Sequence, residues 1–90
     1  MKEQALREHV AALLRQIDPE PEREGLERTP ERVARALTFL TRGHDQDPRE
    51  VINGALFVED YSEMIVLKDV DFYSLCEHHI LPFFGKAHVA

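Results

Sequence analysis

The chain is most informative near its end, where it reads Asp71-Phe72-Tyr73-Ser74-Leu75-Cys76-Glu77-His78-His79-Ile80-Leu81-Pro82-Phe83-Phe84-Gly85. This segment holds the single cysteine and two of the five histidines, flanked by aromatic and apolar side chains. Cys76 and His79 are three residues apart, so both side chains can face one point on a helical turn or in a tight loop. A thiolate and an imidazole that converge in this way form half of a catalytic zinc site with an open position. We expect His78, between them, to point elsewhere and to be free to move a proton.

On spacing alone, the same Cys-x-x-His pattern also describes a buried thiol next to a hydrogen-bonded imidazole. A stable zinc site needs three or four protein ligands, and the sequence has no second cysteine. His88 is the only other nearby candidate, and no pattern predicts that it turns back toward Cys76. The residues by themselves leave both interpretations open.

Composition and charge argue against several classes of protein. With 90 residues, 43% of them hydrophobic and 31% charged, the sequence predicts a small globular protein rather than a disordered one. A net charge of -6 argues against a nucleic-acid partner, which would require clustered Lys and Arg. No apolar run approaches the ~20 residues that span a bilayer, and the first residues lack the apolar core of a signal peptide. The unpaired cysteine fits a reducing compartment, so we expect a cytoplasmic protein without a membrane partner.

The first part of the sequence predicts helices. Between residues 2 and 17, apolar side chains recur every three or four positions, as on one face of a helix: Leu6, Val10, Leu13, Leu14 and Ile17. His9 borders this face, and we interpret it as a helix-surface residue rather than a ligand. A proline-containing connector ends this helix. A further short helix is expected from Asp47, with Gly54 as its cap.

Another helix is expected to begin at Thr29, as its N-cap, and to end at Gly43. Arg32 and Arg35 share one face of this helix because they are three residues apart. Solvated surface arginines and an anion-binding patch are both consistent with this spacing.

The pattern then changes to β-rich residues. Residues 64–72 predict a strand, and a second strand is expected from about Lys86, after a turn marked by Pro82 and Gly85. Helices that are followed by antiparallel strands predict an α+β fold.

Several segments resemble the GTP cyclohydrolase I family. They are Arg23-Glu24-Gly25-Leu26, Thr29-Pro30-Glu31-Arg32-Val33-Ala34, Phe72-Tyr73-Ser74-Leu75-Cys76-Glu77-His78-His79 and Pro82-Phe83-Phe84-Gly85-Lys86-Ala87-His88-Val89-Ala90. The last two form a long and specific block, and the resemblance covers the chain from about residue 23 to its end. It implies a tunnelling fold (T-fold). Residues 1–45 would then be an N-terminal helical region, and residues 46–90 the start of the catalytic domain, incomplete at the C-terminus.

The resemblance implies a zinc-dependent enzyme that converts GTP and water to formate and 7,8-dihydroneopterin triphosphate, in folate and pterin synthesis. Cys76 and His79 are similar to two of the family's three zinc ligands, and His78 is similar to its catalytic histidine. Zinc would activate water for attack on C8 of guanine, and a histidine would protonate the departing ring nitrogen. Arg32 matches a position associated with the triphosphate, as does Arg35, where the family often has Lys. The family's ring-shaped homodecamer implies that this protein is also a homo-oligomer.

The resemblance also implies that part of the site is missing, because the family's third zinc ligand is a cysteine beyond the position of residue 90. One alternative is therefore a catalytically incomplete fragment, or a non-enzymatic piece that needs a partner chain. Another is a different T-fold enzyme on a purine-like or pterin-like substrate, with Cys76 as a covalent nucleophile and His78 as its base.

Overall fold

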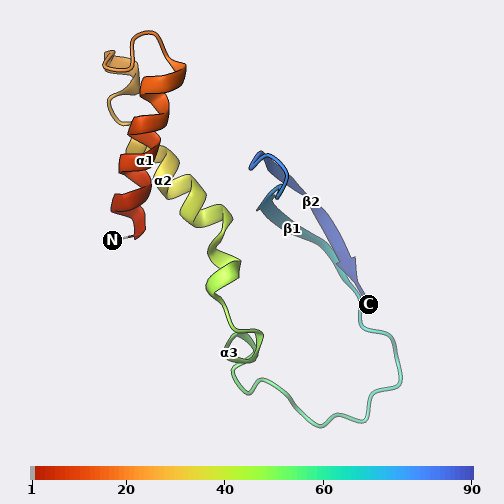
Figure 1. Cartoon of the computed structure of the whole chain (residues 1–90). Coiled ribbons are helices and arrows are strands. Elements are labelled where there is room, and N and C mark those ends of the chain that lie inside the picture. The colour runs from red at the N-terminus through yellow and green to blue at the C-terminus, as the bar shows by residue number, and fades with distance from the viewer. Residues whose placement is uncertain (1) are drawn as a thin grey trace. The chain divides into compact units, whose positions relative to one another are not determined.

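The computed structural model describes residues 2–90, which form two compact units, one up to Phe39 and one from Leu40 to Ala90. Helices come first and a two-stranded antiparallel sheet follows, so the predicted α+β class is confirmed (Figure 1). The predicted domain boundary between residues 45 and 46 stays a prediction. Within residues 2–90, no helix is both long enough and apolar enough to cross a membrane.

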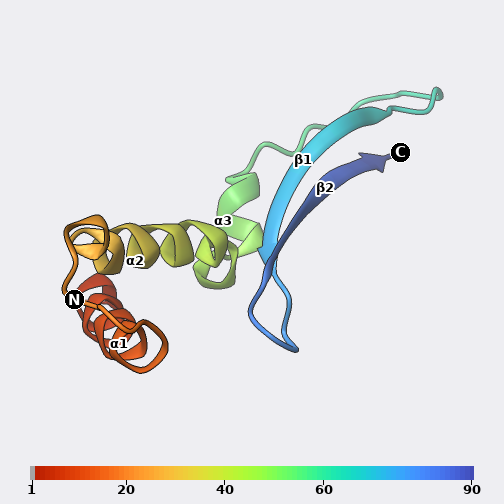
Figure 2. The same cartoon turned by 90° about the horizontal axis from the view of Figure 1, so that it is seen from above.

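The first unit contains helix α1 (Lys2–Ile17) and nearly all of helix α2 (Thr29–Leu40), and the two helices cross each other (Figures 1 and 2). Among the described residues, the buried apolar side chains are Val10 on α1 and Ala34 on α2. An ion pair between Glu3 and Arg35 also joins the helices, with 3.7 Å between Oε1 and Nε. The bounds of α1 match the prediction, and Val10 belongs to the apolar face that predicted it.

Both ends of α2 differ from the prediction. The Arg32 N–H donates to the Arg28 carbonyl at 3.0 Å, so the first helical carbonyl belongs to Arg28 and Thr29 lies inside the first turn. After α2 the chain continues into a 3₁₀ turn, η2 (Arg42–Asp45). Gly43 lies within η2 and does not adopt the left-handed conformation of a helix cap, so its predicted role is wrong.

The short helix α3 (Pro48–Ile52) begins as expected, because Asp47 Oδ1 accepts a hydrogen bond of 2.9 Å from a first-turn amide. Its C-cap is Asn53, with a φ of 46°, rather than the predicted Gly54. Asparagine tolerates this left-handed conformation better than most residues, and Gly54 then continues it with a φ of 72°.

The strands β1 (Leu67–Leu75) and β2 (Pro82–Val89) form a long, curved hairpin (Figure 2). Both extend closer to the intervening loop than predicted, because β1 continues past residue 72 and β2 begins before residue 86. Leu75 pairs with Pro82 across the sheet, and this pairing sets the strand ends. Cross-strand pairing joins residues that are distant in sequence, so the local pattern does not reveal it. The cysteine–histidine loop therefore follows β1 directly.

Gly85 lies inside β2, opposite Phe72, and not in the predicted turn. A Cβ atom at this position would be 2.8 Å from Cζ of Phe72, because that ring lies over the glycine. The same ring meets Phe83 edge to face, with 6.1 Å between the ring centroids. The ring of Phe72, rather than a turn, is the reason for glycine here.

We expect Gly85→Ala to destabilise the hairpin by about 1 kcal/mol, because Phe72 must move away from residue 85 and from Phe83. Gly43→Ala is the matched control, since nothing lies within 4 Å of a Cβ atom added there. Urea unfolding curves of both variants measure the difference. Equal midpoints for the two variants would show that the Phe72 ring does not restrict residue 85.

β1 has an irregular register between Leu67 and Val70, where it bulges opposite His88. Asp69 has a φ of 57°, and its backbone N–H donates to Nδ1 of His88 at 3.0 Å. The imidazole thus replaces the carbonyl acceptor that the interrupted ladder does not supply. His88, the further ligand candidate of the sequence, has a structural partner here.

Asp18 organises the connector that follows α1. Its Oδ1 accepts a hydrogen bond from the Glu20 N–H at 2.9 Å and another from the Arg23 guanidinium at 2.6 Å. The backbone hydrogen bond from Glu20 lowers the pKa of Asp18 below its ordinary value of 3.8, and Arg23 lowers it further. Partial desolvation of the carboxyl raises the pKa, but by less than these contacts lower it.

The lowered pKa of Asp18 predicts a pH-dependent contribution to stability. A carboxyl whose pKa is lower in the folded state stabilises the fold fully above its unfolded pKa, and loses this effect as pH falls through the folded pKa. We expect Asp18→Ala to lower the thermal midpoint at neutral pH and to have little effect once the wild-type carboxyl is protonated. Thermal unfolding at neutral pH and at an acid pH that protonates Asp18 tests this. Glu22→Ala is the control, because Glu22 is an exposed carboxylate of the same connector. A difference that persists undiminished in acid would contradict the prediction.

Candidate metal and catalytic loop

The loop from Cys76 to Leu81 joins β1 to β2. Two backbone hydrogen bonds close it: Cys76 N–H donates to the Leu81 carbonyl at 2.9 Å, and Ile80 N–H donates to the Cys76 carbonyl at 2.8 Å. Ile80 is left-handed, with a φ of 59°. This conformation is strained for a β-branched residue, and such strain is concentrated at functional sites. The three-residue spacing of Cys76 and His79 allowed a helical turn or a tight loop, and the structure has the tight loop.

The loop brings Cys76 and His78 together. The Sγ atom of Cys76 lies 3.6 Å from Nδ1 of His78, within reach of a weak sulfur hydrogen bond. The expectation that His78 points away from Cys76 is therefore wrong for this conformation. Residues two apart in a tight loop can face the same side, as they do in a strand, whereas on a helix they lie on roughly opposite sides.

His79 faces the backbone of the loop. Its Nδ1 accepts a hydrogen bond of 3.3 Å from the Leu81 N–H. This contact fixes the orientation of the ring and uses the lone pair of one of its nitrogens. The described contacts thus pair Cys76 with His78, and His79 with the main chain of Leu81.

Within the described part of the chain, no three Cys, His, Asp or Glu side chains form a group that could hold a metal ion. The loop supplies donor atoms of the kinds that zinc prefers, a cysteine sulfur and an imidazole nitrogen. These donors fit zinc in kind, but a complete zinc shell needs more ligands than residues 2–90 bring together.

A hollow beside the loop is lined by Ser74, Cys76, His78, Phe83 and His44, among others. All of these residues belong to the second unit. Sequence reasoning missed His44, which follows α2 and is far from the loop in sequence. No local pattern could have identified it, because only the folded chain places it at this hollow. His79 is not among the lining residues.

Arg32 and Arg35 lie on α2. Arg32 is exposed, and its side chain forms no hydrogen bond or ion pair with the residues that the structure describes. Arg35, 67% exposed, pairs with Glu31 at 2.8 Å and with Glu3 at 3.7 Å. Exposed pairs of this kind are weak, so an incoming anion can displace them. The sequence reasoning missed both glutamates, although the four-residue spacing of Glu31 and Arg35 was a usable signal.

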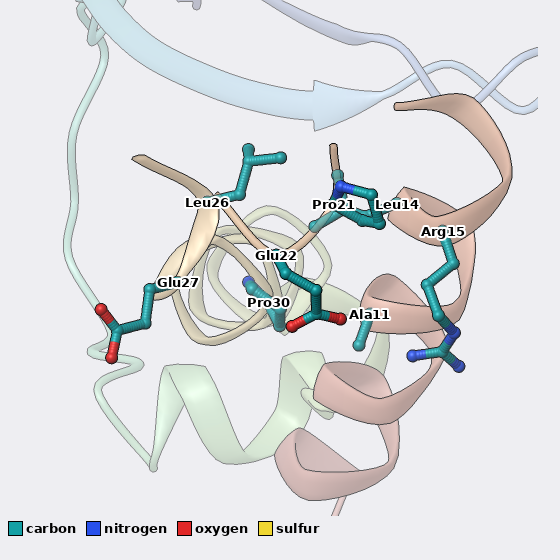
Figure 3. A pocket seen from close by; sticks show the side chains of 8 residues that line it. All are labelled: Ala11, Leu14, Arg15, Pro21, Glu22, Leu26, Glu27 and Pro30. Carbon is teal, nitrogen blue, oxygen red and sulfur yellow. The ribbon is translucent and has the colours of Figure 1, made fainter. Parts of the chain in front are cut away.

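A second hollow belongs wholly to the first unit (Figure 3). It is lined by Ala11, Leu14, Arg15, Pro21, Glu22, Leu26, Glu27 and Pro30. In the close view, Arg15 and Glu27 extend on opposite sides of it, with the apolar Leu14, Leu26 and Pro30 between them. It contains no histidine or cysteine and neither predicted substrate arginine, so we do not assign chemistry to it.

Known proteins share most of this sequence. The sequence profile of the family described as GTP cyclohydrolase I matches residues 6–90. A protein named GTP cyclohydrolase 1 from Chlorobium phaeovibrioides is 59% identical over 87 residues, which cover 97% of this chain and 39% of that protein. A protein of the same name from Porphyromonas gingivalis is 54% identical, over 93% of this chain and 44% of its own length. Another from Parabacteroides distasonis is 56% identical, over 97% of this chain and 45% of its own length.

Helices followed by an antiparallel hairpin, with a cysteine–histidine loop between the strands, define an α+β protein consistent with the T-fold. The chain belongs to the GTP cyclohydrolase I family, as residues 6–90 show. It spans about two fifths of the length of the curated relatives that it matches.

Proposed function

We propose that this chain is the N-terminal part of a zinc-dependent GTP cyclohydrolase I, which converts GTP and water to formate and 7,8-dihydroneopterin triphosphate. The observation that carries the proposal is the match of residues 6–90 to the family, a range that includes the whole cysteine–histidine loop. The donor types of this loop support the proposal, because sulfur and imidazole suit zinc.

In this proposal Cys76 and His79 hold zinc, together with ligands beyond those of the described residues. When bound, the metal would polarise water for attack on C8 of the guanine ring. His78 would move the proton that the departing ring nitrogen requires, because an imidazole can act as a general acid and base. Its position at the hollow beside Cys76 supports this role, since a proton donor must lie next to the reacting atoms.

Arg32 and Arg35 would bind the triphosphate of GTP. The guanidinium of Arg32 is exposed and has no partner among residues 2–90, which supports this role, because it can offer its N–H groups to phosphate oxygens without first losing one of those contacts. Arg35 would exchange its ion pairs with Glu3 and Glu31 for phosphate contacts. The two arginines would then contribute fixed positive charge to a protein whose net charge is -6.

We also propose a cytoplasmic homo-oligomer, decameric as in the family. The aromatic side chains of the hairpin support an assembly, because Tyr73 and Phe84 stack on one face of it and are 50% and 81% exposed. The unpaired Cys76 supports a reducing compartment.

The proposal is tested by measuring zinc content and formate release from GTP on the same sample. Two proteins are compared: the 90-residue chain, and the chain extended with the remaining sequence of its Chlorobium relative. We expect stoichiometric zinc and formate release from the extended protein, and no turnover by the shorter one. An extended protein that is folded and zinc-loaded but releases no formate would refute the proposed activity.

A second candidate function is favoured by the 3.6 Å contact between Cys76 Sγ and His78 Nδ1. In this alternative, His78 takes the thiol proton and Cys76 attacks a purine-like or pterin-like substrate to form a covalent adduct. Mass spectrometry of metal-free protein incubated with GTP separates the two functions. An adduct on Cys76 supports the nucleophile, whereas turnover that depends strictly on zinc supports the cyclohydrolase.

A further inference from the structure

The side chain of His88 fills a gap in the hydrogen-bond ladder of the hairpin. The register places two residues of β1, Lys68 and Asp69, opposite His88 alone. Asp69 is left-handed, with a φ of 57°, and its N–H donates to Nδ1 of His88 at 3.0 Å. This distance is typical of a well-formed N–H hydrogen bond. The imidazole therefore holds the extra residue of the bulge in its place.

This hydrogen bond requires a neutral imidazole. A neutral ring has one nitrogen that accepts and one that carries hydrogen, so Nδ1 of His88 accepts and Nε2 carries the hydrogen. In a protonated ring both nitrogens carry hydrogen, and Nδ1 can no longer accept the Asp69 N–H. His88 and Asp69 are both exposed, so protons reach the ring directly from solvent.

We propose that His88 is a pH-sensitive switch for this end of the hairpin. The neutral ring holds the Asp69 amide and, through it, the bulge, whereas the protonated ring releases both. The pairing of Leu67 with Val89, which lies beyond the bulge, then loosens. Because Leu67 is the first residue of β1, the switch controls how firmly the preceding segment is joined to the sheet. The inference does not depend on the proposed metal and substrate roles.

Few other contacts hold this end of the hairpin together. Beyond the bulge, the described register contains the pair of Leu67 with Val89, whose residues are 62% and 58% exposed. Little apolar area is buried there, so one hydrogen bond is a large part of what keeps the strand ends together. On the other side of the bulge, the register runs without interruption from Val70 to Leu75. We therefore expect the release to stop at the bulge and to leave the rest of the hairpin paired.

The charged groups around the ring come from both strands. The strand packed against His88 is β1, which carries Lys68, Asp69 and Asp71. On β2 itself the charged neighbour is Lys86, whose Nζ lies 3.1 Å from Oδ1 of Asp71. The Asp69 carboxylate attracts a protonated ring, and the Lys68 ammonium repels it. A protonated ring that turned from the Asp69 amide to the Asp69 carboxylate would keep a contact with β1, so the test must follow the strand ends as well as the amide.

The test is a pH titration of the ¹⁵N-labelled 90-residue chain, followed by NMR. The ring signals of His88 give its tautomer and the pH range in which it gains a proton. Over that range, we expect the protection factor of the Asp69 amide against solvent exchange to fall roughly 2- to 10-fold, as for the loss of one hydrogen bond. The cross-strand contacts of Leu67 with Val89 should weaken over the same range, and those of residues 70–75 should remain.

His88→Gln separates the imidazole from the other groups that titrate. Its side-chain oxygen accepts the Asp69 N–H at every pH, while the carboxylates of Asp69 and Asp71 are unchanged. Protection of the Asp69 amide should therefore stay constant over the range in which the wild type loses it. His9→Gln is the matched control, because it removes an exposed imidazole from α1, in the other unit, and it should behave like the wild type at Asp69.

Three results would overturn the proposal. The first is hydrogen on Nδ1 of the neutral His88 ring. The second is an Asp69 amide that keeps its protection when His88 is protonated, or that loses it equally in His88→Gln. The third is a released amide with the pairing of Leu67 and Val89 intact, which would show that the protonated ring holds the strand ends through the Asp69 carboxylate instead.

Discussion

Cys76→Ser is expected to remove zinc from the protein and, with it, the release of formate from GTP. A serine hydroxyl keeps its proton near neutral pH and lacks the soft sulfur that zinc prefers, so one of the proposed ligands is lost. Losing an outer-shell partner typically costs 10–100-fold in metal affinity, and we expect the loss of a ligand to cost at least ~100-fold. Zinc content after dialysis, measured on the chain extended to the length of its relatives, gives the result.

His88→Gln is the control for Cys76→Ser. It removes the histidine that the sequence offers as a further ligand candidate, and that the structure instead pairs with the Asp69 amide at 3.0 Å. Glutamine can still accept from that amide through its side-chain oxygen. We expect this variant to keep its zinc. If Cys76→Ser retained zinc and activity while folding normally, the metal role of Cys76 would be wrong.

Local signals in the sequence were sufficient for the presence of the helices and for the fold class, although not for the ends of α2 or the C-cap of α3. The three- and four-residue spacing that includes Val10 predicted α1 with its observed bounds, and Asp47 predicted the start of α3. Both signals act within one turn of helix, so they need no knowledge of the rest of the chain. The family resemblance of the cysteine–histidine segment was confirmed by the match to residues 6–90.

Features that depend on distant residues were not predictable in this way. Gly85 was assigned to a turn because glycine often marks one, whereas the ring of Phe72, opposite it in the register, is the reason for its small size. The placement of His44 at the same hollow as Cys76 likewise depends on the folded chain. The side-chain directions within the loop depend on its closing hydrogen bonds and on the left-handed Ile80, which no spacing rule describes. The roles of Cys76 and of the other predicted site residues stay predictions.

His78→Gln is expected to separate metal binding from catalysis. Glutamine is close to histidine in size and can hydrogen-bond, but it cannot take up and release a proton near neutral pH. General acid–base catalysis by a positioned side chain contributes typically 10²–10⁴-fold, so we expect kcat to fall by roughly that factor. Zinc content should stay stoichiometric, because His78 is not one of the proposed ligands. The two quantities are measured on the same sample of the extended protein, from formate release and from metal analysis.

His44→Gln is the matched variant for His78→Gln, since both histidines line the hollow that contains Cys76. If proton transfer is specific to His78, His44→Gln should reduce kcat far less than His78→Gln and leave zinc in place. Equal losses in the two variants would mean that general polarity of the hollow, rather than one proton donor, supports the reaction. Loss of zinc in His78→Gln would contradict the division of roles, and would indicate that His78 binds the metal. The 3.6 Å distance between Cys76 Sγ and His78 Nδ1 is the observation that motivates this alternative, because it brings a second imidazole nitrogen close to the proposed sulfur ligand.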